Sequence, residues 1–394
     1  MKLAIRAQCV GVAAVAMCLL ADAHAQQHHY LLNGLDEKVS FDDSGKPVFT
    51  APGHDLVTIM EIGADPAHPK IVANLPLTNS IFGPPVNLQV TPDESLALVA
   101  NSMLWTEEGG KWKPGPDNKL YVIDLRADPP ALSETLEIGR QPSGLAINHA
   151  GDLALVANRA GKSVSVLAIA DGHVRLVDTV PMDDEVASVA ITPDGKRALA
   201  VKNTAGKVAV LEISGQKVTY DKSLDMLVGQ FPYNIDITPD GRAALVAHTG
   251  NGGRPDGNAD PLAIIDLTQE PPRVADYISA GDAPEAFAIS PSGKIAGAVL
   301  LGGVILPKDH WAYKRNGSLV VLKIDGLKLT KIKEIEVGAL PEGIAFSPDG
   351  SYMYVSSFFD SDVRVFRVTG TDVSDTGIRI GLPGHPGSMR ARAR

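Results

Sequence analysis

Two glutamates, Glu285 and Glu342, occupy the same place in two copies of one sequence pattern. The copies read APEAFAISPSG from Ala283 and LPEGIAFSPDG from Leu340. If the repeated units surround an axis, equivalent side chains converge on it, and the two carboxylates then meet. Such a pair could act as general acid and base or hold a divalent cation of unknown identity. The alternative is that each carboxylate accepts hydrogen bonds from backbone N–H groups of its own loop.

A second set of polar residues lies at the ends of the next strands, which we expect to follow the strands that carry the glutamates. These residues are Asn101, Asn158, Lys202 and His248. A histidine beside a glutamate is the minimum for general base catalysis or for a metal site of imidazole and carboxylate, so Glu285, His248 and Glu342 are the catalytic candidates. Lys202 or Arg254 would hold an anionic group or a developing oxyanion. No local metal motif such as HExxH is present.

These candidates are positioned by a repeated unit of short strands and tight turns. In the clearest copy, the runs Glu342 to Phe346 and Tyr352 to Ser356 flank the turn Ser347-Pro348-Asp349-Gly350. Proline presets φ, aspartate caps the turn through its side chain, and glycine takes the positive φ. Related turns begin at residues 91, 148, 192, 238 and 290, and the weaker copy Asp42-Asp43-Ser44-Gly45 makes seven. Spacings of 44 to 57 residues predict an all-β fold, a seven-bladed β-propeller of four-stranded antiparallel blades.

The order of strands within a blade sorts the loops by face. We name the strands A to D from the axis outward; the short A-to-B turns lie on one face, and the B-to-C and D-to-A loops share the other. At the carboxyl end, Gly384-His385-Pro386 resembles a D-to-A loop, and we expect Glu37 to Phe41 to supply the missing A strand. Equivalent A-strand positions at the channel entry are then Val86, Ser143, Ala187, Tyr233, Glu285 and Glu342, with Glu37 in the closing blade.

Three B-to-C loops are long, and all lie on the face that carries the candidate residues. They cover residues 101–118, 248–260 and 301–316. Loops of this length without secondary structure tend to be binding loops or lids. They hold every tryptophan of the chain, which suggests a rim over the channel mouth; alternatively, the rings only pin the loops down. The expected binding residues are Trp105, Trp112, Lys202, Tyr233, Arg254, His310 and Trp311.

The amino-acid sequences of the repeats resemble those of a known protein family. The strings LVANRAGKSVSVLAI from Leu155 and EGIAFSPDGSYMYVSS from Glu342 are similar to the YVTN seven-bladed propellers, which include lactonase-like propellers and many exported bacterial proteins. The resemblance implies a small-molecule site at the channel mouth that hydrolyses a lactone or an ester. The alternatives are a non-catalytic binding module that uses the tryptophan rim, or an accessory subunit of a periplasmic redox enzyme, because similar propellers serve quinone-bearing amine dehydrogenases.

The amino terminus reads as a secretory signal peptide over residues 1–25, followed by one propeller domain over residues 26–394. Lys2 and Arg6 precede an apolar run from Cys9 to Leu20, and Ala23-His24-Ala25 is a small-x-small cleavage site. We therefore expect a periplasmic or secreted monomer without a membrane span. Its partner would be a small molecule or a periplasmic protein.

Composition and missing motifs exclude several classes of function. Both cysteines lie in the leader, so the mature chain offers no thiolate for catalysis or metal binding. The net charge of −10 argues against nucleic acid as a partner. The sequence also lacks a G-x-S-x-G elbow, a P-loop, a dinucleotide fingerprint and a haem attachment motif.

Overall fold

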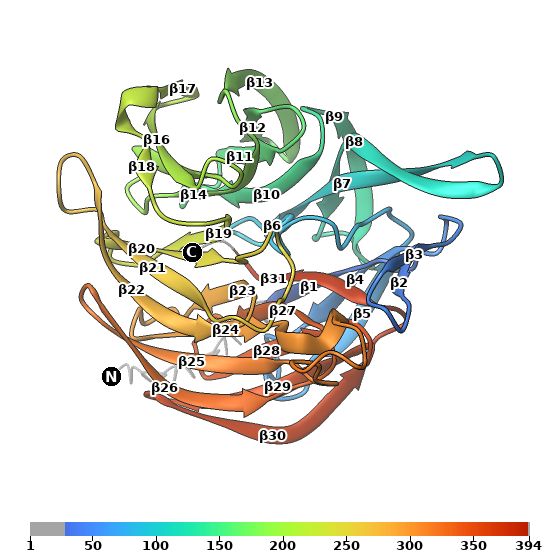
Figure 1. Cartoon of the computed structure of the whole chain (residues 1–394). Helices are drawn as coiled ribbons and strands as arrows, with labels where there is room; N and C mark the ends of the chain where they lie inside the picture. The colour runs from blue at the N-terminus through green and yellow to red at the C-terminus, as the bar shows by residue number, and fades with distance from the viewer. Residues whose placement is uncertain (1–27, 393–394) are drawn as a thin grey trace, which may run out of the picture.

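The computed structural model describes residues 28–392, so the expected leader lies outside the described residues. Seven four-stranded antiparallel sheets surround a central channel (Figure 1), which confirms the predicted all-β, seven-bladed propeller. Among the described residues, no helix is long and apolar enough to cross a bilayer.

Blades 2 to 4 follow one another along the chain, each ordered from its inner to its outer strand. Blade 2 contains β6 (Leu88–Val90), β7 (Leu96–Glu108), β8 (Lys111–Asp124) and β9 (Ala131–Glu137). Blade 3 contains β10 (Pro142–Ile147), β11 (Leu153–Asn158), β12 (Ser163–Ala170) and β13 (His173–Pro181). Blade 4 contains β14 (Val186–Ile191), β15 (Arg197–Lys202), β16 (Lys207–Ser214) and β17 (Lys217–Tyr220), and β18 (Met226–Leu227) also pairs with β16 after the short 3-10 helix η1 (Lys222–Leu224).

Blades 5 to 7 repeat this order. Blade 5 contains β19 (Pro232–Ile237), β20 (Ala243–His248), β21 (Asp260–Asp266) and β22 (Arg273–Gly281). Blade 6 contains β23 (Pro284–Ile289), β24 (Ile295–Leu300), β25 (Ser318–Asp325) and β26 (Lys328–Glu336), with the 3-10 helix η2 (Gly302–Ile305) in its B-to-C loop. Blade 7 contains β27 (Pro341–Phe346), β28 (Tyr352–Ser357), β29 (Asp362–Thr369) and β30 (Asp372–Gly381).

The turn that defines the repeat is built as its sequence predicts. In blade 7 the Ser347 hydroxyl donates to Asp349 Oδ1 at 2.6 Å, and the Gly350 N–H donates to the Ser347 carbonyl at 2.9 Å. Gly350 has a φ of +71°, which a β-carbon would strain. The turn therefore joins strands A and B tightly, and variation is left to the opposite face.

Ring closure differs from the sequence prediction. The inner strand of blade 1 is β31 (Pro386–Arg390), which pairs with β1 (Tyr30–Leu35), and the blade continues through β4 (Leu56–Glu61) and β5 (Lys70–Leu75). The expectation that Glu37 to Phe41 supplies this inner strand is wrong. Pro386 is the first residue of β31, just as Pro284 and Pro341 are the first residues of the inner strands β23 and β27. This proline identifies β31 as an inner strand in the sequence.

The segment mistaken for the inner strand forms a hairpin inserted between β1 and β4. Its strands are β2 (Val39–Phe41) and β3 (Pro47–Phe49), which pair only with each other. Residues 42–45, counted above as the seventh repeat turn, form the tip of this hairpin. The blade count remains seven because both ends of the chain contribute to blade 1.

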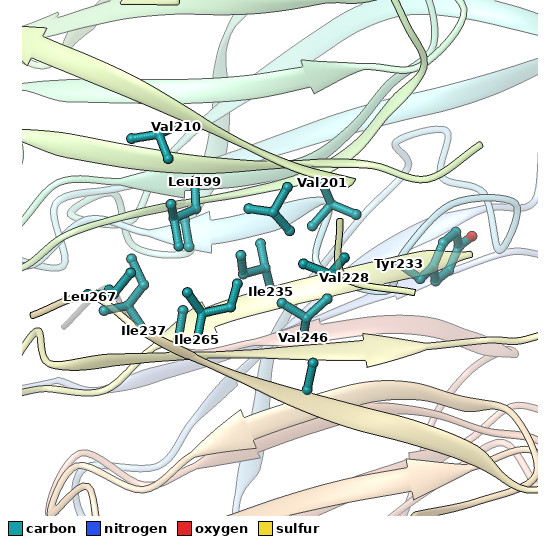
Figure 2. Packing of buried hydrophobic residues seen from close by; sticks show 14 of the residues in the cluster. Leu199, Val201, Val210, Val228, Tyr233, Ile235, Ile237, Val246, Ile265 and Leu267 are labelled. Carbon is teal, nitrogen blue, oxygen red and sulfur yellow. The ribbon is translucent and has the colours of Figure 1, made fainter. Parts of the chain in front are cut away.

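The hydrophobic core lies between the blades. The described residues contain seven buried apolar clusters of this kind, one at each blade interface. Figure 2 shows the interface of blades 4 and 5, where Val201 and Val210 lie on one side and Ile235 and Val246 on the other. Each blade is thus stabilised by its two neighbours, and closure of the ring leaves no blade with an uncovered face.

A further apolar cluster covers the mouth of the channel. It joins β2 and β3 to the loops of blades 1, 2, 6 and 7, and its buried members include Val39, Trp105, Leu340 and Phe358. The blade 2 insertion is not an irregular loop as expected, because residues 101–118 continue β7 and β8 as a long hairpin that projects from the ring (Figure 1). The insertions therefore form a roof over one end of the channel.

Candidate functional site

A β-bulge at the start of several inner strands turns one side chain towards the channel. In β23, Pro284 pairs with Leu300 and Ala286 pairs with Val299, so Glu285 is an extra residue without a partner. Glu342 is the corresponding extra residue in β27, and Tyr233 is the one in β19. A bulge re-aims the side chain that it carries, which is how three equivalent positions come to face one space.

The backbone just before these bulges has an unusual conformation. Gln141, Phe231, Ala283 and Leu340 each precede the proline that begins an inner strand, and all have φ between +45° and +56°. Residues other than glycine rarely adopt this region, and such conformations gather at functional sites. The surrounding fold thus holds the chain in a fixed shape at the channel mouth.

Glu285, Glu342 and Tyr233 line a cavity of about 420 Å³ beneath the roof. This size is within the range of small-molecule sites. The other lining residues come from the hairpin β2–β3 and from loops of blades 2, 3, 5, 6 and 7. The sequence prediction that these three residues share the channel entry agrees with their placement.

Both glutamates are almost completely buried, and burial is the largest influence on their ionisation. Glu285 is 7% exposed and Glu342 is 2% exposed. Burial raises the pKa of Glu285 to about 8, although the positive charge of Arg159 opposes the rise. Burial also raises the pKa of Glu342 well above its ordinary value, and the neighbouring Glu285 charge raises it further. At neutral pH the pair therefore keeps at least one proton.

The alternative that each carboxylate is bonded to its own loop does not fit Glu342. Its Oε2 atom is buried and has no hydrogen-bond partner among the described residues. A buried carboxyl oxygen without a partner is costly in a folded protein and calls for an explanation. Glu342 is also a lining residue of the cavity, so this carboxyl is adjacent to the space that a ligand would occupy.

Arg159 is the functional candidate that the sequence reasoning missed. It follows β11 in a short loop of blade 3 and lines the cavity, with its guanidinium carbon 5.8 Å from the centre of the Tyr233 ring. Its Nε is buried and has no hydrogen-bond partner in the part of the chain that the structure describes. Its signal in the sequence is a cation directly after the B strand, at the loop face of the propeller.

The hairpin β2–β3 forms part of the roof and is fastened to two other insertions. Arg254 donates through Nη2 to the Gly45 carbonyl at 2.6 Å. Lys308 forms an ion pair with Asp43 at 2.7 Å. Arg254 lines the cavity, but one of its N–H groups is already used to hold the hairpin.

His248 does not lie where the sequence prediction placed it. Its side chain is fully buried within blades 4 and 5, with Nε2 2.7 Å from the Val228 carbonyl and Nδ1 3.2 Å from the Pro261 carbonyl. Burial lowers its pKa, so the ring is neutral at pH 7. The B strand ends inside the blade rather than at the axis, and His248 is therefore not brought to Glu285.

Lys202 and Glu37 are also directed elsewhere. Lys202 Nζ donates to Asp183 at 2.6 Å and to Asp225 at 2.8 Å. Burial alone would lower the pKa of Lys202, but hydrogen bonds to Asp183, Asp225 and Tyr220 outweigh it and raise the pKa. Glu37 accepts a hydrogen bond from the His385 N–H, and Gly387 occupies the blade 1 position equivalent to Glu285. The space there is tight for a larger residue, because an added Cβ would lie 3.1 Å from the Ile81 Cα.

The three tryptophans do not form one surface. Trp105 is 6% exposed and stacks on Phe82 with ring centres 6.1 Å apart, whereas Trp112 packs half-buried against the same roof cluster. Trp311 is 79% exposed and lies beside His310, with ring centres 5.7 Å apart. Trp105 thus packs within the buried cluster of the roof. Trp311 and His310 lie outside the cavity, and Trp311 is exposed at the surface.

The described residues contain no group of three or more histidine, cysteine, aspartate or glutamate side chains arranged to hold a metal ion. His248 and His310 contact different aromatic partners, Tyr277 and Trp311. The polar side chains of the candidate site are the two glutamate carboxyls, the guanidinium groups of Arg159 and Arg254, the Gln141 amide and the Tyr233 phenol.

A second cavity, of about 520 Å³, opens at the opposite end of the channel. Small aliphatic residues of the inner strands and prolines of the A-to-B turns line most of it, together with the carboxyl-terminal Arg390 and Arg392. The buried carboxyl pair is at the other end, so the mouth cavity is the site with the groups needed for acid–base chemistry.

Comparison with known proteins agrees with this fold. The lactonase seven-bladed β-propeller family model matches residues 121–226. The structure is similar to a putative 6-phosphogluconolactonase of Bacteroides fragilis, with a TM-score of 0.71 and 15% identity over 94% of this chain and 99% of that one. It is also similar to a periplasmic gluconolactonase of Pseudomonas aeruginosa, with a TM-score of 0.65 and 19% identity over 93% and 99% of the two chains.

Among curated proteins, a match over 112 residues at 32% identity links the chain to actin-interacting protein 1-2 of Arabidopsis thaliana. This match spans 28% of this chain and 17% of that relative's length. The resemblance to lactonase-like seven-bladed propellers, stated above from the repeats, is confirmed by the family model and by the fold.

Proposed function

We propose that this lactonase-like propeller hydrolyses a lactone or an ester in the cavity at the mouth of its channel. The observation that carries the proposal is the buried pair Glu285 and Glu342 beside the Arg159 guanidinium, in a cavity of molecular size. Two carboxyls whose surroundings give them different proton affinities can serve as a base and an acid in one reaction. The lactonase-like neighbours support the same class of reaction.

Each residue has a separate role in this scheme. The Arg159 charge favours the ionised form of Glu285, and the fraction of ionised Glu285 grows as the pH rises towards its pKa of about 8. In that carboxylate form Glu285 accepts a proton from water while the water oxygen bonds to the carbonyl carbon. Arg159 stabilises the negative charge that develops on the carbonyl oxygen. The ring C–O bond then breaks, and Glu342 donates its proton to the departing alkoxide. The product is a hydroxy acid, and a proton passes back to Glu342 before the next cycle.

Variants of the carboxyl pair test the reaction. Glu285→Gln and Glu342→Gln should each lower kcat for lactone hydrolysis by about 100-fold or more, because general acid–base groups contribute that much. Glu107→Gln, on the exposed end of the β7–β8 hairpin, is the matched control and should retain full activity. Activity of the pair variants equal to that of the control would exclude the proposed roles.

The second candidate function is binding without turnover in the same cavity. The mostly apolar lining favours it, because such a lining binds ligands whether or not chemistry follows. A stoichiometric ligand that co-purifies with the protein and is released unchanged, together with no hydrolysis in a lactone and ester panel, would support this function. The tryptophan rim is a weaker basis for it, since Trp105 is buried.

We also propose export to the periplasm, on the strength of the leader-like residues 1–25 and a periplasmic gluconolactonase among the structural neighbours. Amino-terminal sequencing of the protein recovered from a periplasmic fraction should begin at Gln26. A protein that stays in the cytoplasm with Met1 intact would contradict this proposal.

A further inference from the structure

The walls and roof of the mouth cavity are aromatic and aliphatic. Five aromatic rings line it, those of Phe41, Phe49, Phe82, Phe231 and Tyr233. Phe49 meets Phe82 and Trp105 edge-on, at centroid distances of 6.0 and 5.8 Å, and Phe231 stacks on Tyr233 at 6.1 Å. The rings thus support one another and present a firm apolar surface to a ligand.

Two of these rings come from the hairpin β2–β3, which is inserted between β1 and β4 of blade 1. The hairpin is fixed at its tip by Arg254 and Lys308, and at its base by the buried Lys38. Lys38 donates to Asp36 at 2.9 Å and also to Asp55 and the Asn79 carbonyl. A preformed apolar roof costs a ligand less ordering free energy than a loop that must close over it.

The charges of the cavity do not suit a phosphorylated ligand. The cations among the described lining residues are Arg159 of blade 3 and Arg254 of blade 5, and Arg254 is engaged with the Gly45 carbonyl. The cation of Lys202 is neutralised by Asp183 and Asp225 outside the cavity. A phosphate group carries −1.5 to −2 charges at pH 7, and no cluster of free cations among the described lining residues would compensate for burying it beside two glutamates.

A sugar ring is disfavoured for a related reason. Each buried hydroxyl needs a hydrogen-bond partner, and burial without one costs about 1 to 3 kcal/mol on protein scales. The charged and amide side chains of the lining are those of Gln141, Arg159, Arg254, Glu285 and Glu342, and the strands of the hairpin contribute only Phe41, Pro47 and Phe49. One end of a ligand can therefore be polar, and the rest must be apolar.

We infer that the cavity selects uncharged lactones with an apolar body, such as aryl or alkyl-substituted lactones, and rejects sugar lactones and their phosphates. This inference rests on the proposed hydrolase function for the reaction, but its claim about ligand class concerns binding. The lactone carbonyl would face Arg159 and the glutamates, and the apolar body would lie against Phe49 and Phe231.

Binding and turnover are measured separately. Isothermal titration uses two hydrolysis-resistant lactams of similar ring size, the aryl lactam 3,4-dihydro-2-quinolinone and the sugar analogue gluconolactam, together with 6-phosphogluconate and benzylamine. We expect the aryl lactam to bind at least 10-fold more tightly than the other three probes. Phe49→Ala should weaken aryl lactam binding at least 5-fold, whereas Ile332→Ala, on the outer strand of blade 6, should leave it unchanged. Melting curves of both variants report whether they are folded.

The outcomes distinguish the two proposals. Tighter binding of gluconolactam, 6-phosphogluconate or benzylamine, or equal binding of all probes, would overturn the inference on ligand class. Hydrolysis of gluconolactone but not of dihydrocoumarin would also overturn it while leaving the hydrolase function intact. Selective binding of the aryl lactam without hydrolysis of dihydrocoumarin would support the ligand class and refute the hydrolase.

Discussion

Replacing Glu285 by glutamine should make the protein less sensitive to alkaline pH. The pKa of Glu285 is raised from the ordinary 4.5 to about 8 by burial, so the folded protein binds this proton more tightly than the unfolded chain does. Stability from this group is therefore fully present below pH 4.5 and is lost as the pH rises to about 8. Each pH unit across that interval is worth about 1.4 kcal/mol, which gives a loss of about 5 kcal/mol.

The glutamine variant lacks this titration and should not lose that free energy. Unfolding entropy of about 2.1 cal/mol/K per residue, over roughly 365 described residues, converts 5 kcal/mol into about 6 °C of Tm. At pH 5 the wild type and Glu285→Gln should melt within about 1 °C of each other, because glutamine resembles the protonated acid. At pH 9 the variant should melt about 6 °C higher.

Differential scanning calorimetry of the ligand-free protein between pH 5 and pH 9 measures this effect. Glu107→Gln is the matched control, because Glu107 is exposed and its replacement should leave the pH dependence of the wild type unchanged. Parallel Tm curves for Glu285→Gln and the wild type would refute the reasoning that Glu285 is buried in its acid form. A variant that melts lower than the wild type at every pH would instead mark Glu285 as a structural hydrogen-bonding group.

Three further predictions concern stability. Lys38→Met should lower the free energy of unfolding by about 3 to 5 kcal/mol in urea titrations, because it leaves the buried Asp36 carboxylate without its cation, and unchanged stability would contradict that view of the cluster. Trp105→Ala should cost about 3 to 5 kcal/mol while Trp311→Ala stays within about 0.5 kcal/mol, and equal effects would mean that burial does not separate them. Deleting residues 386–394, and with them β31, should abolish cooperative melting, whereas deleting only residues 393–394 should not; a truncated chain that melts like the full one would show that β31 does not close the ring.

Local residue chemistry is sufficient to predict much of the architecture. Turns such as Ser347-Pro348-Asp349-Gly350 define their own geometry through a proline, a capping carboxylate and a positive φ. Six such turns mark blades 2 to 7, whereas blade 1 has none because the two ends of the chain form it. The equivalence of Glu285 and Glu342 is likewise visible in the sequence, because both follow the proline that begins an inner strand. Because each blade buries its faces only against its neighbours, repetition of the unit predicts a ring of blades.

Closure of the ring and assembly of the site depend on contacts between distant segments. The proline that begins β31 marks this segment as an inner strand, as in β23 and β27, but the pairing of β31 with β1 joins segments more than 350 residues apart and depends on closure of the ring. His248 and Lys202 end their strands as polar residues, but neighbouring carbonyls and carboxylates bind them inside the blades. Arg159 meets the glutamates only because blades 3, 6 and 7 face one channel, and the inserted hairpin covers that channel only once the ring is closed.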